Sequence, residues 1–323
     1  MNSENMKFIN DIGFVPLVVA NNTEDAVALG KALVAGGIPI AEVTFRTDEA
    51  LACMKAMSVE VPELLLGAGT VHTVAQAEAA VAAGATFIVT PAFNPAVIEW
   101  CLDKQIDIIP GTVSPAEIEQ ASAYGLKVCK FFPAGVYGGP KALKAFAGPF
   151  SDMKFLPTGG VDEKNMEDYL ALPNVFALGG SFLTPSAMLK AKDWTGITRT
   201  CQSIMQSLFG FSLGHIGLQP QTEKEAEEIT DTLCRIFLQE KINTPGAFFA
   251  GSIAEICKKE TAGEKGHICI DTYDLERAMA YYHRKGIAFN KDRCFYDDQG
   301  RIKVIFFAET TGGFSMHLRR KSR

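Results

Sequence analysis

One lysine of this sequence lies in a segment that is otherwise almost entirely apolar. Lys130 is the fourth residue of the run KVCKFFPA at 127–134. A strand of that composition belongs to a core, where an ammonium group without a partner costs several kcal/mol. Burial disfavours the charged form of an amine, and the neutral amine is the form that attacks a ketone to give a Schiff base. The competing interpretation is a lysine at a strand end whose head reaches water.

Side chains with complementary chemistry lie near the ends of other apolar runs. In one of these runs, the alternation of a strand places Glu42, Thr44 and Arg46 on one side. A single carboxylate can transfer the protons of an aldol reaction, and a guanidinium binds a carboxylate through two parallel hydrogen bonds. Thr70 and Pro91 end the next two runs and are candidate substrate-binding positions. Glu42 and Arg46 could instead form a salt bridge with each other. A catalytic site is therefore indicated only because several such residues are expected to lie close together.

Two glycine turns end the last two of these runs, at Gly159-Gly160 and at Gly179-Gly180-Ser181. Glycine lets backbone N–H groups come close to a phosphate, and the N-terminus of a following helix adds positive potential. Glycine also ends strands for purely steric reasons. One such turn is therefore weak evidence, whereas the pair at consecutive strand ends indicates a phosphate site.

The elements that must position these residues alternate with a period near twenty residues. Eight strand-like runs occur at 14–20, 40–45, 64–70, 87–92, 106–111, 128–133, 155–160 and 175–180. Alanine-rich, helix-like segments lie between them, opened by capping residues such as Thr23 and Ser114. This pattern predicts an α/β fold, a (β/α)8 TIM barrel whose strand carboxyl ends share one mouth. A doubly wound open sheet is the alternative, but no Gly-x-Gly-x-x-Gly motif follows the first strand.

In this order, the motifs resemble the 2-keto-3-deoxy-6-phosphogluconate (KDPG) and 4-hydroxy-2-oxoglutarate (KHG) aldolase family. The matching segments are EVTFRT at 42–47, GAGTV at 67–71, KFFPA at 130–134, PTGG at 157–160 and GGS at 179–181. The resemblance runs from about residue 8 to residue 208. It implies a class I, metal-independent aldolase, typically trimeric, that cleaves KDPG, KHG or both. The products would be pyruvate and an aldehyde, either glyceraldehyde 3-phosphate or glyoxylate.

The resemblance also implies a role for each matching residue. Lys130 would form the Schiff base with the substrate, and Glu42 would act as the general acid and base. Arg46 and Thr70 would hold the carboxylate end of the pyruvyl group, and Phe132 would line the pocket. Four backbone positions would receive the distal phosphate, namely Gly159, Gly160, Gly180 and Ser181. The aldolase reaction itself would need no cofactor.

After the predicted barrel domain at 1–210, residues 211–323 predict a smaller α+β domain of two similar βαβββ units. The phrases GHIGL at 214–218 and GHICI at 266–270 mark the repeat. The first unit is abridged, with expected strands at 214–219, 247–250 and 253–258 and a helix at 223–239. The second has a strand at 266–271, a helix at 275–285 and strands at 287–289, 293–296, 301–308 and 314–319.

The paired units resemble the vicinal oxygen chelate superfamily, which includes the glyoxalases. That superfamily binds a divalent metal in the cup of its curved sheet. The matching positions here are His215, Glu255, His267 and His317. Imidazole and carboxylate ligands suit Zn, Ni, Fe, Mn or Co. The alternative is that these histidines only form hydrogen bonds on a half-buried sheet.

Three functions for the whole chain follow from these resemblances. The first is an aldolase barrel with an appended metal-binding domain. In the second, the C-terminal domain is the main enzyme, a metal-dependent isomerase, epimerase or lyase. In the third, that domain binds a metal or a metabolite and regulates or oligomerises the barrel.

Composition excludes several other classes of protein. The formal net charge is −6 over 323 residues, and no broad basic surface with aromatic residues indicates a nucleic-acid partner. No apolar stretch has the length of a membrane span, and the first residues do not resemble a signal peptide. The eight cysteines are scattered without a Cys-x-x-Cys pair, which predicts reduced, mostly buried thiols in a cytoplasmic protein. We expect a small-molecule keto acid as substrate and a homo-oligomer.

Overall fold

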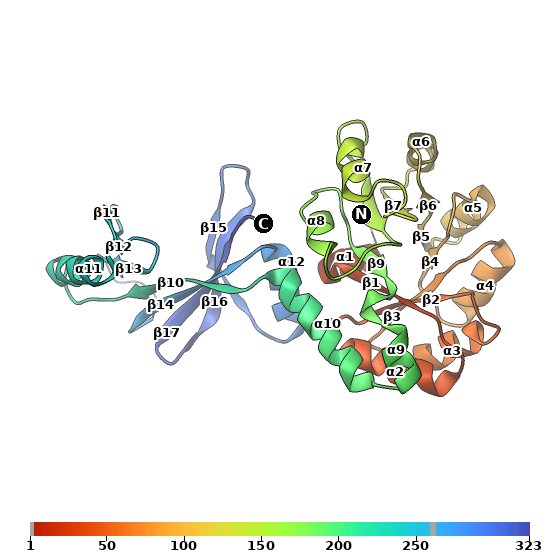
Figure 1. Ribbon diagram of the computed structural model, residues 1–323, viewed down its shortest axis with the longest axis horizontal. Helices are drawn as coiled ribbons and strands as arrows, with labels where there is room; N and C mark the ends of the chain where they lie inside the picture. Colours follow the sequence, from red (N-terminus) through yellow and green to blue (C-terminus); the bar gives the residue numbers. More distant parts are fainter. Residues whose placement is uncertain (1–2, 259–262) are drawn as a thin grey trace. The chain divides into compact units, whose positions relative to one another are not determined.

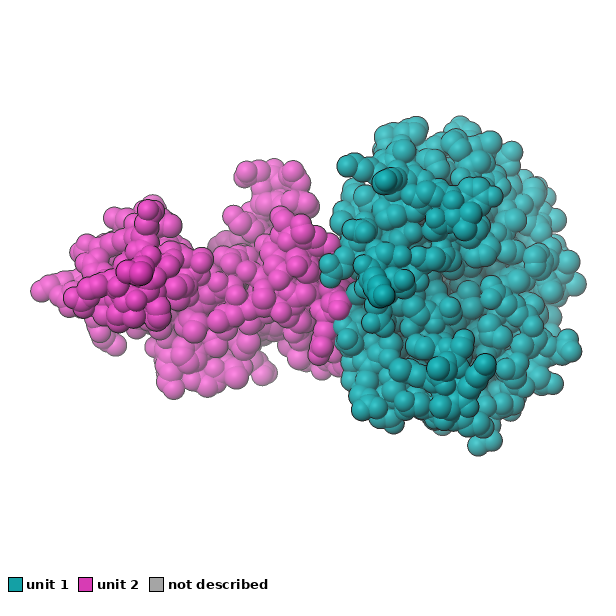
Figure 2. Space-filling view, in the orientation of Figure 1, with its two compact units in different colours: residues 1–205 teal, residues 206–323 magenta. Residues whose placement is uncertain are grey.

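A computed structural model of the protein describes residues 3–258 and 263–323. The chain forms two compact units, Met1–Met205 and Gln206–Arg323, shown in different colours in Figure 2. The boundary falls inside helix α10 (Trp194–Phe209). No helix among the described residues combines the length and the apolar character needed to cross a membrane. Six of the eight cysteines are buried, which confirms the predicted burial of most thiols.

The first unit is a curled sheet of parallel strands with helices on its outside (Figure 1). Its strands are β1 (Phe14–Val18), β2 (Ile40–Thr44), β3 (Leu65–Gly69), β4 (Phe87–Val89), β5 (Asp107–Ile109), β6 (Gly111–Thr112), β7 (Val128–Phe131), β8 (Lys154–Pro157) and β9 (Leu178–Gly180). Hydrogen-bonded neighbours follow the orders β5-β4-β3-β2-β1-β9 and β6-β7-β8. Pro110 alone separates β5 from β6, and a bridge between Thr158 and Gly179 joins β8 to β9. The strands therefore return to their starting point, which confirms the predicted parallel α/β architecture.

Helices connect these strands in the predicted places. They are α1 (Glu4–Ile12), α2 (Thr23–Ala35), α3 (Ala50–Glu60), α4 (Val74–Ala82), α5 (Pro95–Asp103), α6 (Pro115–Ala123), α7 (Gly139–Phe146), α8 (Met166–Leu170), the 3₁₀ turn η1 (Ser181–Leu183) and α9 (Ser186–Ala191), followed by α10. Ser114 caps α6 as predicted, in a capping box with Glu117. The cap of α2 was predicted one residue too late, because Asn22 rather than Thr23 accepts the N–H of Asp25.

Two charged residues are buried in the otherwise largely apolar interior of the curled sheet. The five residues of β1 and the five of β2 are all buried, as expected for parallel strands covered on both faces. Large side chains such as Phe14, Phe87 and Phe155 have no exposed surface. Among the described residues of this unit, Glu42 and Lys130 are the only charged residues that are buried.

The second unit is built on a mixed sheet. Its strands are β10 (Ser212–Leu218), β11 (Lys241–Asn243), β12 (Ala247–Ala250), β13 (Ala254–Cys257), β14 (Gly266–Thr272), β15 (Phe289–Tyr296), β16 (Ile302–Thr311) and β17 (Phe314–Arg320). Their order is β11-β12-β13-β10-β14-β17-β16-β15. Helix α11 (Glu223–Phe237) follows β10, and α12 (Leu275–Arg284) follows β14. Strand β10 is parallel to β13, β14 is parallel to β17, and β10 and β14 pair antiparallel at the centre.

This sheet differs from the prediction in two places. The first half contains a third short strand after its helix, β11, whose three exposed residues gave no apolar pattern to detect. In the second half, a register shift between Asn290 and Cys294 lies within one strand, β15, where two strands were predicted. Apolar side chains of β12 and β13 pack against α11, through Phe248, Ile256 and Ala226. The alternate residues of the same strands therefore face the other side of the sheet.

Candidate active site and candidate metal centre

The two buried charges of the first unit form one ion pair. The Nζ atom of Lys130 lies 3.0 Å from Oε1 of Glu42, with the two side chains 5% and 0% exposed. Strands β7 and β2, which carry them, are not neighbours in the sheet. The two side chains must therefore meet across the interior of the curled sheet.

The surroundings of Glu42 leave its second oxygen without a partner. A Cβ atom at position 69 would come within 2.2 Å of Oε1, so only glycine leaves room for the carboxylate beside β3. Atom Oε2 is buried and has no hydrogen-bond partner among the described residues. A buried polar atom of this kind needs an explanation, and an oxygen that accepts a proton from a bound substrate provides one.

Three further predicted residues lie around the strand ends. Thr70 follows β3 in a left-handed conformation with φ of 57°, which is rare for a β-branched residue and is typical of functional sites. The ring centre of Phe132 lies 5.4 Å from the amine of Lys130. Pro91 follows β4, and its carbonyl group packs closely on Gly111.

Arg46 stands apart from the buried pair. It is exposed beyond the end of β2 and lines a cavity of about 360 Å³ with Phe45, Thr47 and Gln76 among others. Within residues 3–258 and 263–323, no carboxylate lies within ion-pair distance of its guanidinium. The structure therefore leaves this cation available to an anionic ligand, but it does not bring Arg46 into contact with Lys130 or Glu42.

The two glycine turns lie side by side. The bridge between Thr158 and Gly179 aligns the end of β8 with the end of β9. Gly159 and Gly160 have φ of 84° and 81°, which favours glycine, and a Cβ on Gly160 would come within 3.0 Å of the Cα of Gly135. Gly180 has extended backbone, and the exposed Ser181 follows it.

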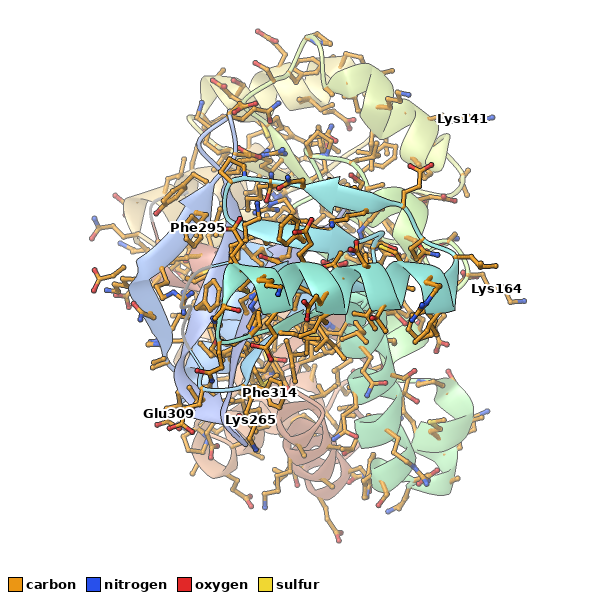
Figure 3. All side chains as sticks on the ribbon, turned by 90° about the vertical axis from the view of Figure 1, so that its left-hand side faces the viewer. Lys141, Lys164, Lys265, Phe295, Glu309 and Phe314 are labelled. Atoms are coloured by element: carbon orange, nitrogen blue, oxygen red, sulfur yellow. The ribbon has the colours of Figure 1, made fainter. Side chains whose placement is uncertain are left out.

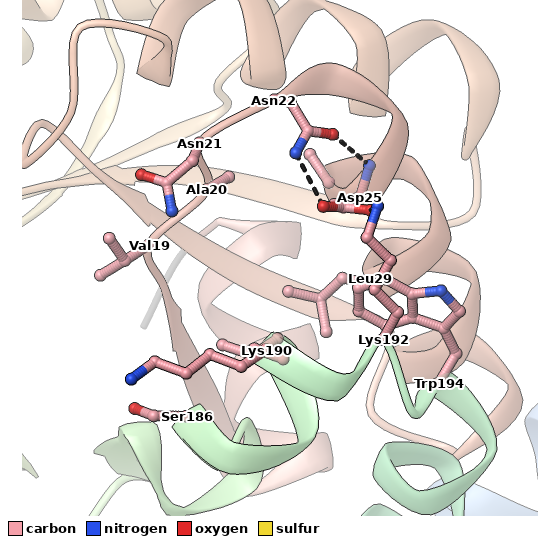
Figure 4. Close-up of a pocket in the computed structure, with 12 residues that line it drawn as sticks. Val19, Ala20, Asn21, Asn22, Asp25, Leu29, Ser186, Lys190, Lys192 and Trp194 are labelled. Carbon is pink, nitrogen blue, oxygen red and sulfur yellow. Dashed lines mark hydrogen bonds and ion pairs between the residues drawn. The ribbon is translucent and has the colours of Figure 1, made fainter.

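A second cavity, of about 330 Å³, lies next to the end of β1 (Figure 4). Val19, Asn21, Ser186 and Lys190 are among its lining residues. An ion pair of 2.8 Å between Lys192 and Asp25 forms part of its wall. Sequence reasoning did not single out Ser186 or Lys190, because they lie beyond the strand ends in α9 and only the fold brings them back to β1.

Comparison with known proteins decides the family of the first unit. Residues 6–200 match the family model described as KDPG and KHG aldolase. The chain belongs to the KDPG/KHG aldolase family. It is 45% identical over 192 residues to the 2-dehydro-3-deoxy-phosphogluconate aldolase of Treponema pallidum, covering 59% of this chain and 91% of that protein. It is 43% identical over 192 residues to the KHG/KDPG aldolase of Escherichia coli strain K12, covering 59% and 90%.

A solved aldolase structure supports the same assignment. The KDPG aldolase of Legionella pneumophila, with pyruvate captured as a covalent carbinolamine, matches with a TM-score of 0.61 and 38% identity. The match covers 63% of this chain and 99% of that one. This chain is accordingly an aldolase, a carbon–carbon lyase, in its first unit. The family match ends at residue 200, so the second unit must be interpreted from its own residues.

In the second unit of this aldolase, the four predicted metal ligands converge on one face of the sheet. Atom Nε2 of His215 lies 3.1 Å from Nε2 of His267 and 3.2 Å from Oε2 of Glu255. The distance from Nε2 of His267 to the same oxygen is 3.5 Å. The ring of His317 lies 5.1 Å from that of His267. Its Nδ1 atom is buried and has no hydrogen-bond partner in the part of the chain that the structure describes. A Cβ on Gly217 would come within 2.1 Å of the ring of His267, so this glycine makes room for the cluster.

The protonation of the cluster follows from burial and from its internal hydrogen bonds. Burial by itself would raise the pKa of Glu255, but hydrogen bonds from His215 and His267 lower it to about 2. Burial would lower the pKa of His267, whereas hydrogen bonds with Cys257 and with Glu255 raise it to about 9. Burial, and after it the positive charge of the neighbouring His267, lower the pKa of His317 to about 3. The cluster therefore holds an ionised carboxylate, a proton shared near His267, and a neutral imidazole.

Three residues next to this cluster were missed by sequence reasoning. Strand pairing places Cys269 between His215 and His317, and its thiol belongs to one of the groups that could hold a metal ion. Phe306 pairs with His317, with ring centres 4.5 Å apart. Arg293 lies over the ring of Phe306 at 3.6 Å. Their positions depend on strand register, for which the sequence carries no short-range signal.

Proposed function

We propose that the first unit is a (β/α)8 barrel that cleaves KDPG, KHG or both through a Schiff base on Lys130. The observation that carries this proposal is the buried pair of Lys130 and Glu42, with one carboxylate oxygen left free. The names of the relatives at 45% and 43% identity support the substrate class. By resemblance to the family, we also propose that the protein is a homotrimer.

The proposed reaction needs only an amine and a carboxylate. A proton passes from Lys130 to Glu42, 3.0 Å away, and the neutral amine attacks the ketone carbon to give a carbinolamine. Glu42 returns the proton to the carbinolamine hydroxyl, which leaves as water to give a protonated imine. Glu42 then removes the proton from the hydroxyl on C4. The C3–C4 bond breaks, its electron pair moves toward the imine nitrogen, and the aldehyde leaves. The resulting enamine takes a proton at C3 from Glu42, and water releases pyruvate and the free amine.

The remaining predicted residues would position the two ends of the substrate. We propose that Arg46 and Thr70 hold the carboxylate end, with Phe132 and Pro91 lining the pocket. The guanidinium of Arg46 lacks a protein carboxylate among the described residues and can form two parallel hydrogen bonds with that group. The adjacent turns at Gly159-Gly160 and Gly180-Ser181 would offer backbone N–H groups to the phosphate of KDPG.

Trapping with borohydride tests this proposal directly. Reduction of the enzyme in the presence of pyruvate should add one reduced pyruvyl group, and peptide mass spectrometry should locate it on Lys130. Lys154, whose amine binds the carbonyl of Pro173, should stay unmodified. An adduct on any other lysine would overturn the assignment of Lys130.

We further propose that the second unit is a vicinal oxygen chelate domain of two βαβββ units that binds one divalent metal. The ligands would be His215, Glu255, His267 and His317. Ligand atoms about 2.1 Å from one ion stand roughly 3.0 to 3.4 Å apart in octahedral or tetrahedral geometry. Three ligand atoms of the cluster are already 3.1 to 3.5 Å apart, and the free Nδ1 of His317 offers a fourth. The ligand atoms of His215, Glu255 and His267 therefore fit such an ion.

A metal held there would act as a Lewis acid toward an oxygen ligand. The role of the chain's own residues is to present three imidazoles and one carboxylate on a rigid sheet. Element analysis of the purified protein should find about one Zn, Ni, Fe, Mn or Co per chain. EDTA should remove it while aldol cleavage persists. If the protein is metal-free and takes up none of these ions, the histidines are structural.

A further inference from the structure

Arg293 occupies an unusual position next to the proposed metal centre. Strand β15 pairs with β16 at Asn290 with Phe306 and again at Cys294 with Ile305. Three residues of β15 therefore lie between two consecutive residues of its partner. Such bulges redirect side chains and are common beside functional sites. This one places the guanidinium of Arg293 over the ring of Phe306, with Cζ 3.6 Å from the ring centre.

The same ring contacts two of the proposed metal ligands. Phe306 is 7% exposed, and its ring centre lies 4.5 Å from that of His317 and 6.5 Å from that of His267. One aromatic ring therefore separates Arg293 from the proposed ligands. Phe295, labelled in Figure 3, is 53% exposed and packs on the edge of Phe306. The arrangement is an apolar platform with a cation at its margin.

The guanidinium of Arg293 has no carboxylate partner within residues 3–258 and 263–323. Four other arginines of this unit have carboxylate partners, namely Arg277, Arg301, Arg319 and Arg320. Stacking satisfies the face of a guanidinium, but its N–H donors lie in its plane and still need acceptors. Partial burial lowers the pKa of this arginine.

We propose that Arg293 binds the carboxylate of an organic acid whose other end reaches the metal centre. The proposal rests on the metal site proposed above. A guanidinium matches a carboxylate through two parallel hydrogen bonds. The ring of Phe306 would contact the carbon chain between the carboxylate and the metal-binding oxygen. The second unit would thus select small hydroxy or oxo acids that carry a remote carboxylate.

A cobalt-substituted protein tests the proposal without any assay of activity. Co²⁺ in the full-length protein gives visible absorption bands that change when a ligand reaches the metal. Titration with malate, which has a hydroxyl group and two carboxylates, should shift these bands. Malamide, its neutral diamide, should bind at least about tenfold more weakly, the effect expected for loss of a charge-assisted hydrogen bond.

Variants assign this preference to Arg293. Arg293→Met should weaken malate binding at least about tenfold while Co²⁺ stoichiometry stays unchanged. Arg293→Lys should lie between Arg293→Met and the wild type, because a lysine keeps the charge but loses the planar fork. The matched control Arg301→Met removes an arginine that is paired with Asp297, and it should bind malate like the wild type.

Each contrary result has a distinct meaning. If the protein retains no Co²⁺, the metal site itself fails and the proposal falls with it. If Co²⁺ binds but malate leaves the bands unchanged, or if Arg293→Met binds malate normally, only the role of Arg293 is overturned. If glycerol 3-phosphate shifts the bands at lower concentration than malate, the anion is a phosphate and the carboxylate assignment is wrong.

Discussion

Each unit of this chain buries one polar cluster, and the charges within the two clusters are compensated in different ways. In the first unit, Lys130 and Glu42 form one cation and one anion 3.0 Å apart. In the second, two imidazole nitrogens and one carboxylate oxygen lie 3.1 to 3.5 Å apart, on His215, His267 and Glu255. A proton on His267, whose pKa is raised to about 9, relieves their repulsion.

The difference shows what each cluster still lacks. The aldolase pair is electrically complete, and its unused atom is an acceptor, Oε2 of Glu42. A substrate that brings a hydroxyl proton completes it. The second cluster is held together by a proton on His267, and its unused atom among the described residues is Nδ1 of His317. A metal ion could take the place of that proton. We therefore expect covalent chemistry in the first unit and metal-centred chemistry in the second, with little dependence of one on the other.

The largest effect should come from Lys130→Ala. Loss of the amine removes the Schiff base, so aldol cleavage of KDPG and of KHG should fall to background. Pyruvate release, coupled to lactate dehydrogenase, measures the loss. Lys154→Ala is the matched control, because its amine binds the carbonyl of Pro173, and it should keep wild-type turnover. Cleavage that survives in Lys130→Ala would mean that a different group activates the ketone.

Glu42→Gln tests the role of the carboxylate in proton transfer while the amine of Lys130 is retained. The substitution keeps the volume of the side chain but removes its basicity, so turnover should fall by roughly 10²-fold or more. Exchange of the methyl protons of pyruvate in D₂O, followed by NMR, should slow by a similar factor because it needs no aldehyde. Glu49→Gln, at an exposed position before α3, is the control. Normal exchange in Glu42→Gln would assign the proton transfers to water.

His267→Ala tests the independence of the two units. Removal of a central ligand should lower metal content and metal affinity by 10-fold or more, because even outer partners of a ligand are worth about 10- to 100-fold. Aldol cleavage should stay within about twofold of the wild type, because imine chemistry needs no Lewis acid. His283→Ala, on α12 and outside the cluster, should retain the metal. Loss of cleavage on treatment with EDTA would contradict the metal-independent mechanism.

The same comparison explains which features the sequence could predict. Lys130 could be predicted from its apolar surroundings, and the four proposed metal-ligand positions from the resemblance of the paired units to a known superfamily. The 3.0 Å contact of Lys130 with Glu42 could not be derived, since it depends on the curl of the whole sheet. The position of Arg293 depends on a bulge in β15, and bulges follow from long-range register rather than from alternation.

Gly160→Ala tests whether the glycine turn at the end of β8 binds the phosphate of the substrate. Its φ of 81° and its close contact with Gly135 leave little room for a side chain. If the turn binds phosphate, KM for KDPG should rise by about tenfold, the equivalent of one lost contact of about 1.4 kcal/mol, and KM for KHG should change less. Gly125→Ala provides a matched control with φ of 78° and open space around it. Equal losses on both substrates would show that the glycine only shapes the barrel.

The smallest effect should come from Asp271→Asn. This substitution removes the carboxylate that pairs with Arg319, an arginine on the same sheet as Arg293. Burial by itself would raise the pKa of Asp271, but hydrogen bonds from Arg319 hold it below the usual value of 3.8. A carboxylate with a lowered pKa stabilises the folded state above the unfolded pKa, and this contribution is lost as the pH falls through the folded pKa. The variant should therefore lose about 1 kcal/mol of unfolding free energy at neutral pH, because the pair is only partly buried. Below both pKa values, variant and wild type should become equally stable.

Pulse-labelling hydrogen exchange of peptides from β14 and β17, after equilibration in urea, reports the stability of the second unit separately from the barrel. Asp297→Asn is the control, because that carboxylate pairs with the exposed Arg301, and its effect should be smaller. A difference between Asp271→Asn and the wild type that is the same at neutral and at acid pH would trace the loss to packing. A difference that disappears in acid would show that Arg319 is neutralised by Asp271, unlike Arg293, for which no carboxylate partner lies among the described residues.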